Sequence, residues 1–119
     1  MPPEDDDARE ARARTVGTLV LRSARDGDTH FVSLLGELDI AGAPGLEQEL
    51  LRVEASDAPA IVIDLGELEF IDSTGIRMLL MAADRCQGPR RLTILRGPQQ
   101  VHRVFEMTDL VKRLPFADA

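Results

Sequence analysis

The stretch "IVIDLGELEFIDSTGIRMLL", residues 61–80, joins two apolar segments of different periodicity. The first segment, residues 58–65, is a nearly continuous apolar run rich in β-branched side chains, which is typical of a buried strand in a parallel sheet. The second segment, about 74–86, repeats its apolar residues at helical spacing. The stretch therefore predicts a strand followed by a helix.

Between these two segments we expect a connection over residues 66–71, with Leu68 and Phe70 turned inward. Either Asp72 or Ser73 is the natural N-cap of the helix. Both carry a short side chain with an oxygen that can accept from the free backbone N–H groups of the first turn.

A cap does not explain Gly75, because a glycine inside the first helical turn costs about 1 kcal/mol relative to alanine. Its missing side chain would let a partner's backbone or a phosphate approach closely. Free N–H groups and the helix dipole also favour an anion at this end of a helix. A phosphorylatable hydroxyl at this position is therefore chemically sensible.

The helix after this entrance has two distinct faces. At 100° per residue, its inner face holds Ile76, Leu79, Leu80, Ala83 and Cys86. Its outer arc holds Arg77, Met78, Met81 and Arg85. Methionines flanked by arginines suggest an adaptable contact surface; the alternative is that both methionines pack against a neighbouring helix.

The rest of the chain predicts three more strands and two more helices. Strands at 18–24 and 29–38 flank the hairpin signal "DGD". Further along we expect a helix from Pro44, a strand over 90–95 and a final helix over 98–110. The order ββαβαβα predicts an α/β fold, with a small mixed sheet of about four to five strands and helices mainly on one face.

The length of 119 residues predicts one folded domain. We expect a disordered, charged tail over residues 1–15, which lacks hydrophobic periodicity, and the domain over 16–117. The sequence contains no secretory signal and no apolar run long enough to cross a membrane. With Cys86 as its single cysteine, we expect a cytoplasmic protein. Cys86 is interpreted as a small core residue, with a reactive thiol as the lesser alternative.

The net charge of −7 comes from 21 acidic and 14 basic residues. Nucleic acid and anionic membranes both require a basic face, so we expect neither as a partner. His30 and His102 stand alone in a predicted strand and a predicted helix, which argues against a metal site. The sequence also lacks a nucleophile elbow, a phosphate-binding loop and a dinucleotide-binding turn. We expect no enzymatic activity, no catalytic residue, no metal and no cofactor.

Three segments in this order, "LLGELDIAGAPGLEQEL", "IVIDLGELEFIDSTGIRMLL" and "VHRVFEMTDL", resemble the STAS domain. The resemblance covers about residues 16–117. Within that family the chain looks most like the stand-alone bacterial anti-sigma factor antagonists, also called anti-anti-sigma factors. Their motif D-[ST]-[ST]-G after a hydrophobic strand is fairly specific when an upstream G-E-L-D accompanies it.

The resemblance implies a phosphorylation switch. In the family, the hydroxyl after the motif aspartate is phosphorylated by an anti-sigma factor, a Ser/Thr kinase with a histidine-kinase-like ATPase fold. Here that residue is Ser73, with Thr74 as the weaker candidate. The unphosphorylated protein would bind the anti-sigma factor and so release the sigma factor. Phosphorylation would end the binding by charge repulsion, and a PP2C-type phosphatase would restore it.

The resemblance also implies a partner surface around this site, with Asp39 of the "GELD" loop close to the phosphorylated residue. Asp72 is open between a helix cap and a residue that the kinase recognises. The oligomeric state is open between a monomer and a weak dimer. The expected partner-binding residues are Asp39, Asp72, Ser73, Thr74, Gly75, Arg77, Met78, Met81 and Arg85.

The chain also departs from the family's usual pattern, and two other functions compete with the switch. The chain reads Thr108-Asp109-Leu110 where the family often has Thr-Gly-Leu, which we expect to affect only a helix start. A non-switching STAS subunit of a larger complex, such as a lipid transporter or a sensory scaffold, would keep the fold and change the function. Nucleotide binding by the domain itself is disfavoured, because no glycine-rich phosphate loop is present.

Overall fold

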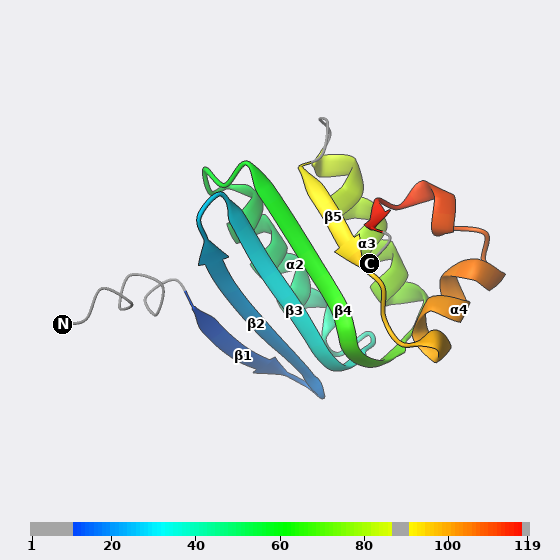
Figure 1. Cartoon of the computed structure of the whole chain (residues 1–119). Helices are drawn as coiled ribbons and strands as arrows, with labels where there is room; N and C mark the ends of the chain where they lie inside the picture. The colour runs from blue at the N-terminus through cyan, green and yellow to red at the C-terminus, as the bar shows by residue number, and fades with distance from the viewer. Residues whose placement is uncertain (1–10, 87–90, 118–119) are drawn as a thin grey trace.

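A six-stranded mixed sheet forms the frame of the molecule (Figure 1), and the computed structural model describes residues 11–86 and 91–117 of the chain. The predicted α/β class is confirmed, but the sheet has six strands rather than four to five. The elements in chain order are β1 (Arg12–Val16), β2 (Leu19–Asp26), β3 (Thr29–Leu38), α2 (Ala43–Glu54), β4 (Ala60–Ile71), α3 (Ser73–Arg85), β5 (Leu92–Leu95), α4 (Gln99–Met107), the 3-10 turn η1 (Val111–Arg113) and β6 (Phe116–Ala117).

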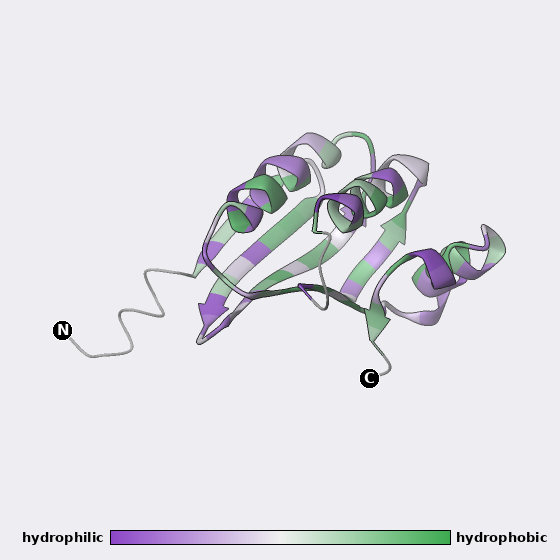
Figure 2. Cartoon of the chain, turned by 90° about the horizontal axis from the view of Figure 1, so that it is seen from above, coloured by the Kyte–Doolittle hydropathy of each residue, from purple (hydrophilic) through white to green (hydrophobic). Residues whose placement is uncertain are grey.

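The strands lie in the sheet in chain order, β1 to β6. The pairs β1–β2 and β2–β3 are antiparallel, whereas β3, β4, β5 and β6 are parallel to one another. Each parallel connection passes through a helix, and Figure 2 shows α2 and α3 side by side over the same face of the sheet. The carboxyl ends of β3, β4 and β5 therefore meet at one edge, where α2, α3 and α4 begin.

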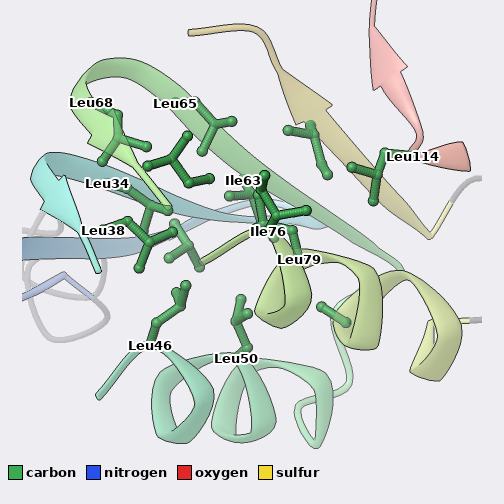
Figure 3. Close-up of a cluster of buried hydrophobic side chains, with 14 of the residues drawn as sticks. Leu34, Leu38, Leu46, Leu50, Ile63, Leu65, Leu68, Ile76, Leu79 and Leu114 are labelled. Atoms are coloured by element: carbon green, nitrogen blue, oxygen red, sulfur yellow. The ribbon is translucent and has the colours of Figure 1, made fainter. Parts of the chain in front are cut away.

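The core lies between the sheet and the helices α2 and α3. Strand residues alternate between this buried face and the opposite face, as the period of two requires. Leu34 and Ile63 from the sheet meet Leu46 of α2 and Leu79 of α3 in one apolar cluster (Figure 3), and each of the four has no exposed surface. Burial of this apolar stripe fixes how both helices sit on the sheet.

Strand β1 corrects the predicted tail boundary, because residues 12–15 were expected to be disordered and instead pair with β2. Two side-chain contacts attach β1 to α2. Arg14 Nη2 donates to Gln48 Oε1 at 2.9 Å, and Val16 packs so tightly on Gly45 that an added Cβ would lie 2.5 Å from Val16 Cγ2. The remaining part of the predicted tail, residues 1–10, lies outside the described residues.

Strand β4 corrects the predicted connection at 66–71. It continues for 12 residues to Ile71 instead of ending near Leu65, and register shifts in its pairing with β3 accommodate extra β4 residues. Leu68 faces the core as expected, but Phe70 is 49% exposed. The shifts change which residues face inward, so simple alternation assigned Phe70 to the wrong face.

The C-terminal segment adds η1 and β6 to the predicted elements. Phe116 of β6 packs edge-on against Phe105 and His102 of α4, with ring centroids 5.1 and 4.9 Å apart. Thr108 ends α4 rather than starting a helix, and its hydroxyl donates to the Val104 carbonyl at 2.7 Å. None of the helices that the structure describes is long and apolar enough to cross a membrane.

Candidate functional site

Two carboxylates lie just beyond the carboxyl ends of the adjacent strands β3 and β4. The last pair of the two strands is Leu38 with Ile71, and the Asp72 N–H donates to the Leu38 carbonyl at 3.2 Å. Asp39 and Asp72 are the residues that follow this pair, so the sheet places them at the same edge. The two aspartates expected from the sequence therefore belong to one surface region.

Asp39 shapes the loop that leads from β3 into α2. Its Oδ1 accepts from the Ala41 N–H at 3.0 Å and, more weakly, from the Gly42 N–H at 3.4 Å. The Asp39 carbonyl accepts from the N–H groups of Gly42 and Ala43. This turn lets α2 begin without a side-chain cap of its own.

Asp72 is the N-cap of α3, which resolves the choice between Asp72 and Ser73. Its backbone is extended, and its Oδ1 accepts from the Thr74 N–H at 3.0 Å and the Gly75 N–H at 3.1 Å. The Asp72 carboxylate therefore already uses two of the N–H groups that were expected to be free for an anion.

Ser73 is the first residue of α3 and presents the more accessible hydroxyl of the motif. Ser73 is exposed, whereas Thr74 is half-buried. The Ser73 hydroxyl has no hydrogen-bond partner among the residues that the structure describes. A hollow of about 200 Å³ lies beside it, lined by Ser73, Thr74, Arg77 and Met78.

Gly75 faces inward, which corrects the interpretation that it clears access for a partner or a phosphate. It is buried, and a Cβ at this position would lie 2.6 Å from Leu38 Cγ and 2.9 Å from Ile71 Cγ1. Glycine is required here because α3 begins directly on the end of the β3–β4 pair. Its role is in internal packing, and it is not available to a partner.

The outer face of α3 is only partly the surface that the sequence predicted. Arg77 and Met81 are exposed, but Met78 is half-buried and packs against the core cluster. Arg85 forms an ion pair with Glu54 of α2, and it lies about 18 Å along the helix from Ser73. Arg77 and Met78 thus line the hollow beside Ser73, Met81 is exposed further along the helix, and Arg85 joins two helices.

Sequence reasoning missed two exposed apolar side chains beside the carboxylates. Ile40 follows Asp39 and is 75% exposed, and Phe70 stands two residues before Asp72 and is 49% exposed. An aliphatic residue inside the polar loop after "GELD" was the available signal for Ile40. Phe70 gave no usable signal, because the register shifts between β3 and β4 set its direction.

The remaining reactive side chains belong to the interior. His30 Nε2 lies 2.8 Å from Ser23 Oγ between β2 and β3. Burial raises the pKa of the Cys86 thiol, and the nearby Glu54 carboxylate raises it further, which makes the thiolate scarce at neutral pH. No group of His, Cys, Asp or Glu within 11–86 and 91–117 is arranged to hold a metal ion.

A family model described as "Mlab, STAS domain" matches residues 21–115, which include every element from β3 to η1. The chain belongs to the STAS domain family. This match confirms the resemblance that the "GELD" and "DSTG" segments carry.

Relatives of this STAS domain protein are named as anti-sigma factor antagonists, which are regulatory binding proteins and not enzymes. BtrV of Bordetella bronchiseptica, which carries that name, is 31% identical over 87 residues, covering 72% of this chain and 75% of BtrV. The crystal structure of an anti-sigma factor antagonist from Mycobacterium paratuberculosis is 28% identical with a TM-score of 0.75, covering 85% of this chain and 86% of that one.

The Bacillus protein SpoIIAA shares the fold of the STAS domain described here. Its unphosphorylated form is 20% identical with a TM-score of 0.61, covering 92% of this chain and 87% of SpoIIAA. A structure of its phosphorylated form matches with a TM-score of 0.59, covering 92% and 90%. SpoIIAA thus keeps this fold in both states.

Proposed function

We propose that this STAS domain protein is an anti-sigma factor antagonist whose binding is switched off by phosphorylation of Ser73. The partner is an anti-sigma factor that is itself a Ser/Thr kinase with a histidine-kinase-like ATPase fold. The unphosphorylated chain binds this partner and so frees the sigma factor. A PP2C-type phosphatase returns the chain to its binding form.

The observation that carries the proposal is an exposed Ser73 hydroxyl, without a hydrogen-bond partner in the described part of the chain, within a mixed apolar and acidic surface. Ile40 and Phe70 supply exposed apolar area, which protein interfaces place at their centre. Asp39 and Asp72 come from the adjacent ends of β3 and β4. A partner that docks on this edge would cover Ser73 and the two carboxylates together.

The proposed modification is a transfer of phosphate from ATP. Ser73 Oγ attacks the γ-phosphorus of ATP, and the bond from that phosphorus to the oxygen bridging to the β-phosphate breaks. ADP leaves, and the serine proton passes to a base supplied by the kinase. The products are ADP and a phosphoserine at position 73.

The proposed switch acts by charge at the interface. A phosphate adds about −1.5 to −2 charge at pH 7. In the complex this charge would be desolvated beside Asp39 and Asp72, and like charges that meet in an interface cost several kcal/mol. Because Ser73 is exposed in the free chain, the phosphate can be accommodated without repacking the core.

Phosphate transfer and binding, measured with an anti-sigma kinase from the same genome, test the proposal. The wild-type chain should take up phosphate from radiolabelled ATP, and Ser73→Ala should abolish the uptake. Thr74→Ala, the matched control that removes the neighbouring hydroxyl, should keep it. Ser73→Asp should weaken binding to the kinase at least tenfold. Uptake by Ser73→Ala, or full binding by Ser73→Asp, contradicts the proposal.

The second candidate is a non-switching STAS subunit of a larger complex, because the description of the matching family model, "Mlab, STAS domain", gives the domain family and does not mention an anti-sigma factor. This function needs the same fold but no phosphate on Ser73. A chain that takes up no phosphate, and whose Ser73→Asp variant still assembles with its complex, would support this second function.

A further inference from the structure

We infer that Arg77 is the counter-charge for phosphorylated Ser73, so that the phosphoryl group is held within the chain by a guanidinium one helical turn away. This inference rests on the proposed phosphorylation of Ser73 and adds how the modified state is stabilised. It concerns a side chain of this protein and requires no contact with a partner.

A phosphate on Ser73 needs a counter-charge, because most N–H groups at this end of the helix already have acceptors. The Thr74 and Gly75 N–H groups already donate to Asp72, and the Ile76 N–H donates to the Asp72 carbonyl. The preceding residue, Asp72, carries a carboxylate that repels a phosphate. These three N–H groups are therefore not free to neutralise the added charge.

Arg77 has the position that this counter-charge requires. Residues four apart on a helix lie about 5–6 Å apart at their Cβ atoms, and side chains lean toward the helix N-terminus. The Arg77 side chain therefore leans toward Ser73, and both residues line the same hollow of about 200 Å³. The hollow is several times larger than the volume of about 30 Å³ that one water occupies in the liquid. It therefore has room for a phosphoryl group, which is a few atoms larger than a water.

Arg77 is also available, in contrast to two arginines of the central helices. Arg52 pairs with Glu49, and Arg85 pairs with Glu54. Arg77 is exposed and forms no ion pair or hydrogen bond with any residue that the structure describes. A negative group placed N-terminal to a positive one at this spacing is the favourable order on a helix. A guanidinium can also bind two phosphate oxygens at once.

The test uses the full chain with phosphoserine installed at position 73 during translation, so that no kinase is needed. ³¹P NMR follows the second ionisation of the phosphate, whose ordinary pKa is about 6. Arg77→Gln should raise this pKa by about half a unit, because the dianion loses its partner. Arg77→Lys should give a smaller rise, and 1 M salt should remove most of the difference.

Arg22→Gln is the matched control, since Arg22 is exposed on the face of the sheet opposite α3. It removes the same charge and should leave the phosphate pKa unchanged. Circular dichroism checks that every variant is folded. Equal phosphate pKa values in wild type and Arg77→Gln, or equal shifts in Arg77→Gln and Arg22→Gln, overturn the inference.

The kinase assay on the unphosphorylated chain separates this inference from the proposed function. If the kinase ignores Ser73 while Arg77→Gln still shifts the phosphate titration, the proposed function fails and the pairing stands. If the kinase phosphorylates Ser73 while the titration is unaffected by Arg77, the proposed function stands and the pairing fails.

Discussion

Arg85 at the end of α3 and Glu54 at the end of α2 form a two-pronged ion pair, with Nε–Oε1 at 2.6 Å and Nη2–Oε2 at 3.0 Å. The Glu54 side chain is 11% exposed and that of Arg85 is 29% exposed. The contact therefore links the two central helices from a largely covered position. It assigns Arg85 to helix packing and leaves Arg77 as the α3 arginine beside the site.

Removal of this pair should lower stability without altering partner binding. Arg85→Ala should reduce the free energy of unfolding by about 0.5–1 kcal/mol, measured by urea titration, and Glu54→Ala should couple to it in a double-mutant cycle. Arg77→Ala, the control on the same helix, should stay within about 0.5 kcal/mol of wild type. Weaker kinase binding by Arg85→Ala, at unchanged stability, would contradict this assignment.

Gly75→Ala should destabilise the fold although alanine favours helices. A Cβ at position 75 would lie 2.6 Å from Leu38 Cγ, so either the helix or Leu38 must move. We expect the overlap to cost about 2–3 kcal/mol, so that a net loss of about 1–2 kcal/mol remains after the gain of about 1 kcal/mol in helix propensity.

Leu38→Ala provides the control for Gly75→Ala. It removes the obstructing side chain, so the added methyl should cost less in that background than in wild type. Equal costs in both backgrounds, from urea denaturation of the four chains, would show that Leu38 is not the obstruction.

Substitutions at Asp72 separate its cap from recognition by the kinase. Asp72→Ala should cost about 1 kcal/mol of unfolding free energy, because the Thr74 and Gly75 N–H groups lose their acceptor. Asp72→Asn should keep most of the stability and remove only the charge. If Asp72→Asn is stable but is phosphorylated much more slowly, Asp72 also serves in recognition; an unchanged rate leaves it as a cap.

Asp109→Gly should stabilise the chain. Asp109 has a φ of 61°, and the family's Thr-Gly-Leu pattern places a glycine at this position. Left-handed backbone costs a non-glycine residue roughly 1–2 kcal/mol, and aspartate tolerates it better than most, so we expect a gain of about 0.5–1 kcal/mol. Asp109→Val should lower the melting temperature, and a lower melting temperature for Asp109→Gly would contradict this account.

Acidification should weaken the fold through His102. Burial lowers the pKa of His102 below its ordinary 6.5, and the Arg96 guanidinium lowers it further. The unfolded chain therefore takes up this proton at a higher pH than the folded chain. The His102 contribution should fall as the pH drops below about 6.5 and stay constant above it. The slope of unfolding free energy between pH 7 and pH 5 should be shallower in His102→Gln, and an equal slope would exclude His102 as its source.

The strands and helices that form the core were predictable, because the periodicity of their apolar residues is visible within each segment. Leu34 and Ile63 lie in apolar alternating runs, and Leu46 and Leu79 recur at helical spacing. β1 was missed because Arg12–Val16 has no large apolar residue before Val16, and its attachment depends on α2. Side-chain contacts with a helix that follows much later in the chain leave no periodic signal in the strand itself.

The site was predictable in composition but not in the direction of each side chain. Ser73 and Asp72 stand at a strand-to-helix junction that the sequence marks plainly. The inward position of Gly75 depends on Leu38, and the pairing of Arg85 depends on Glu54; both partners are more than 30 positions away in the chain. Such contacts become visible only when β3 and α2 are placed next to α3.

Ser73 is exposed on the first turn of α3, and within residues 11–86 and 91–117 no hydrogen bond ties its side chain to the core. A phosphate there would not displace core side chains, so we expect it to leave the conformation of the domain unchanged. Under the proposed function, the partner would detect the phosphate directly at Ser73, and not through a conformational change elsewhere in the domain. The domain could then stay rigid in both states, and evolution could change the partner by altering neighbours such as Ile40 and Phe70 without disturbing the fold.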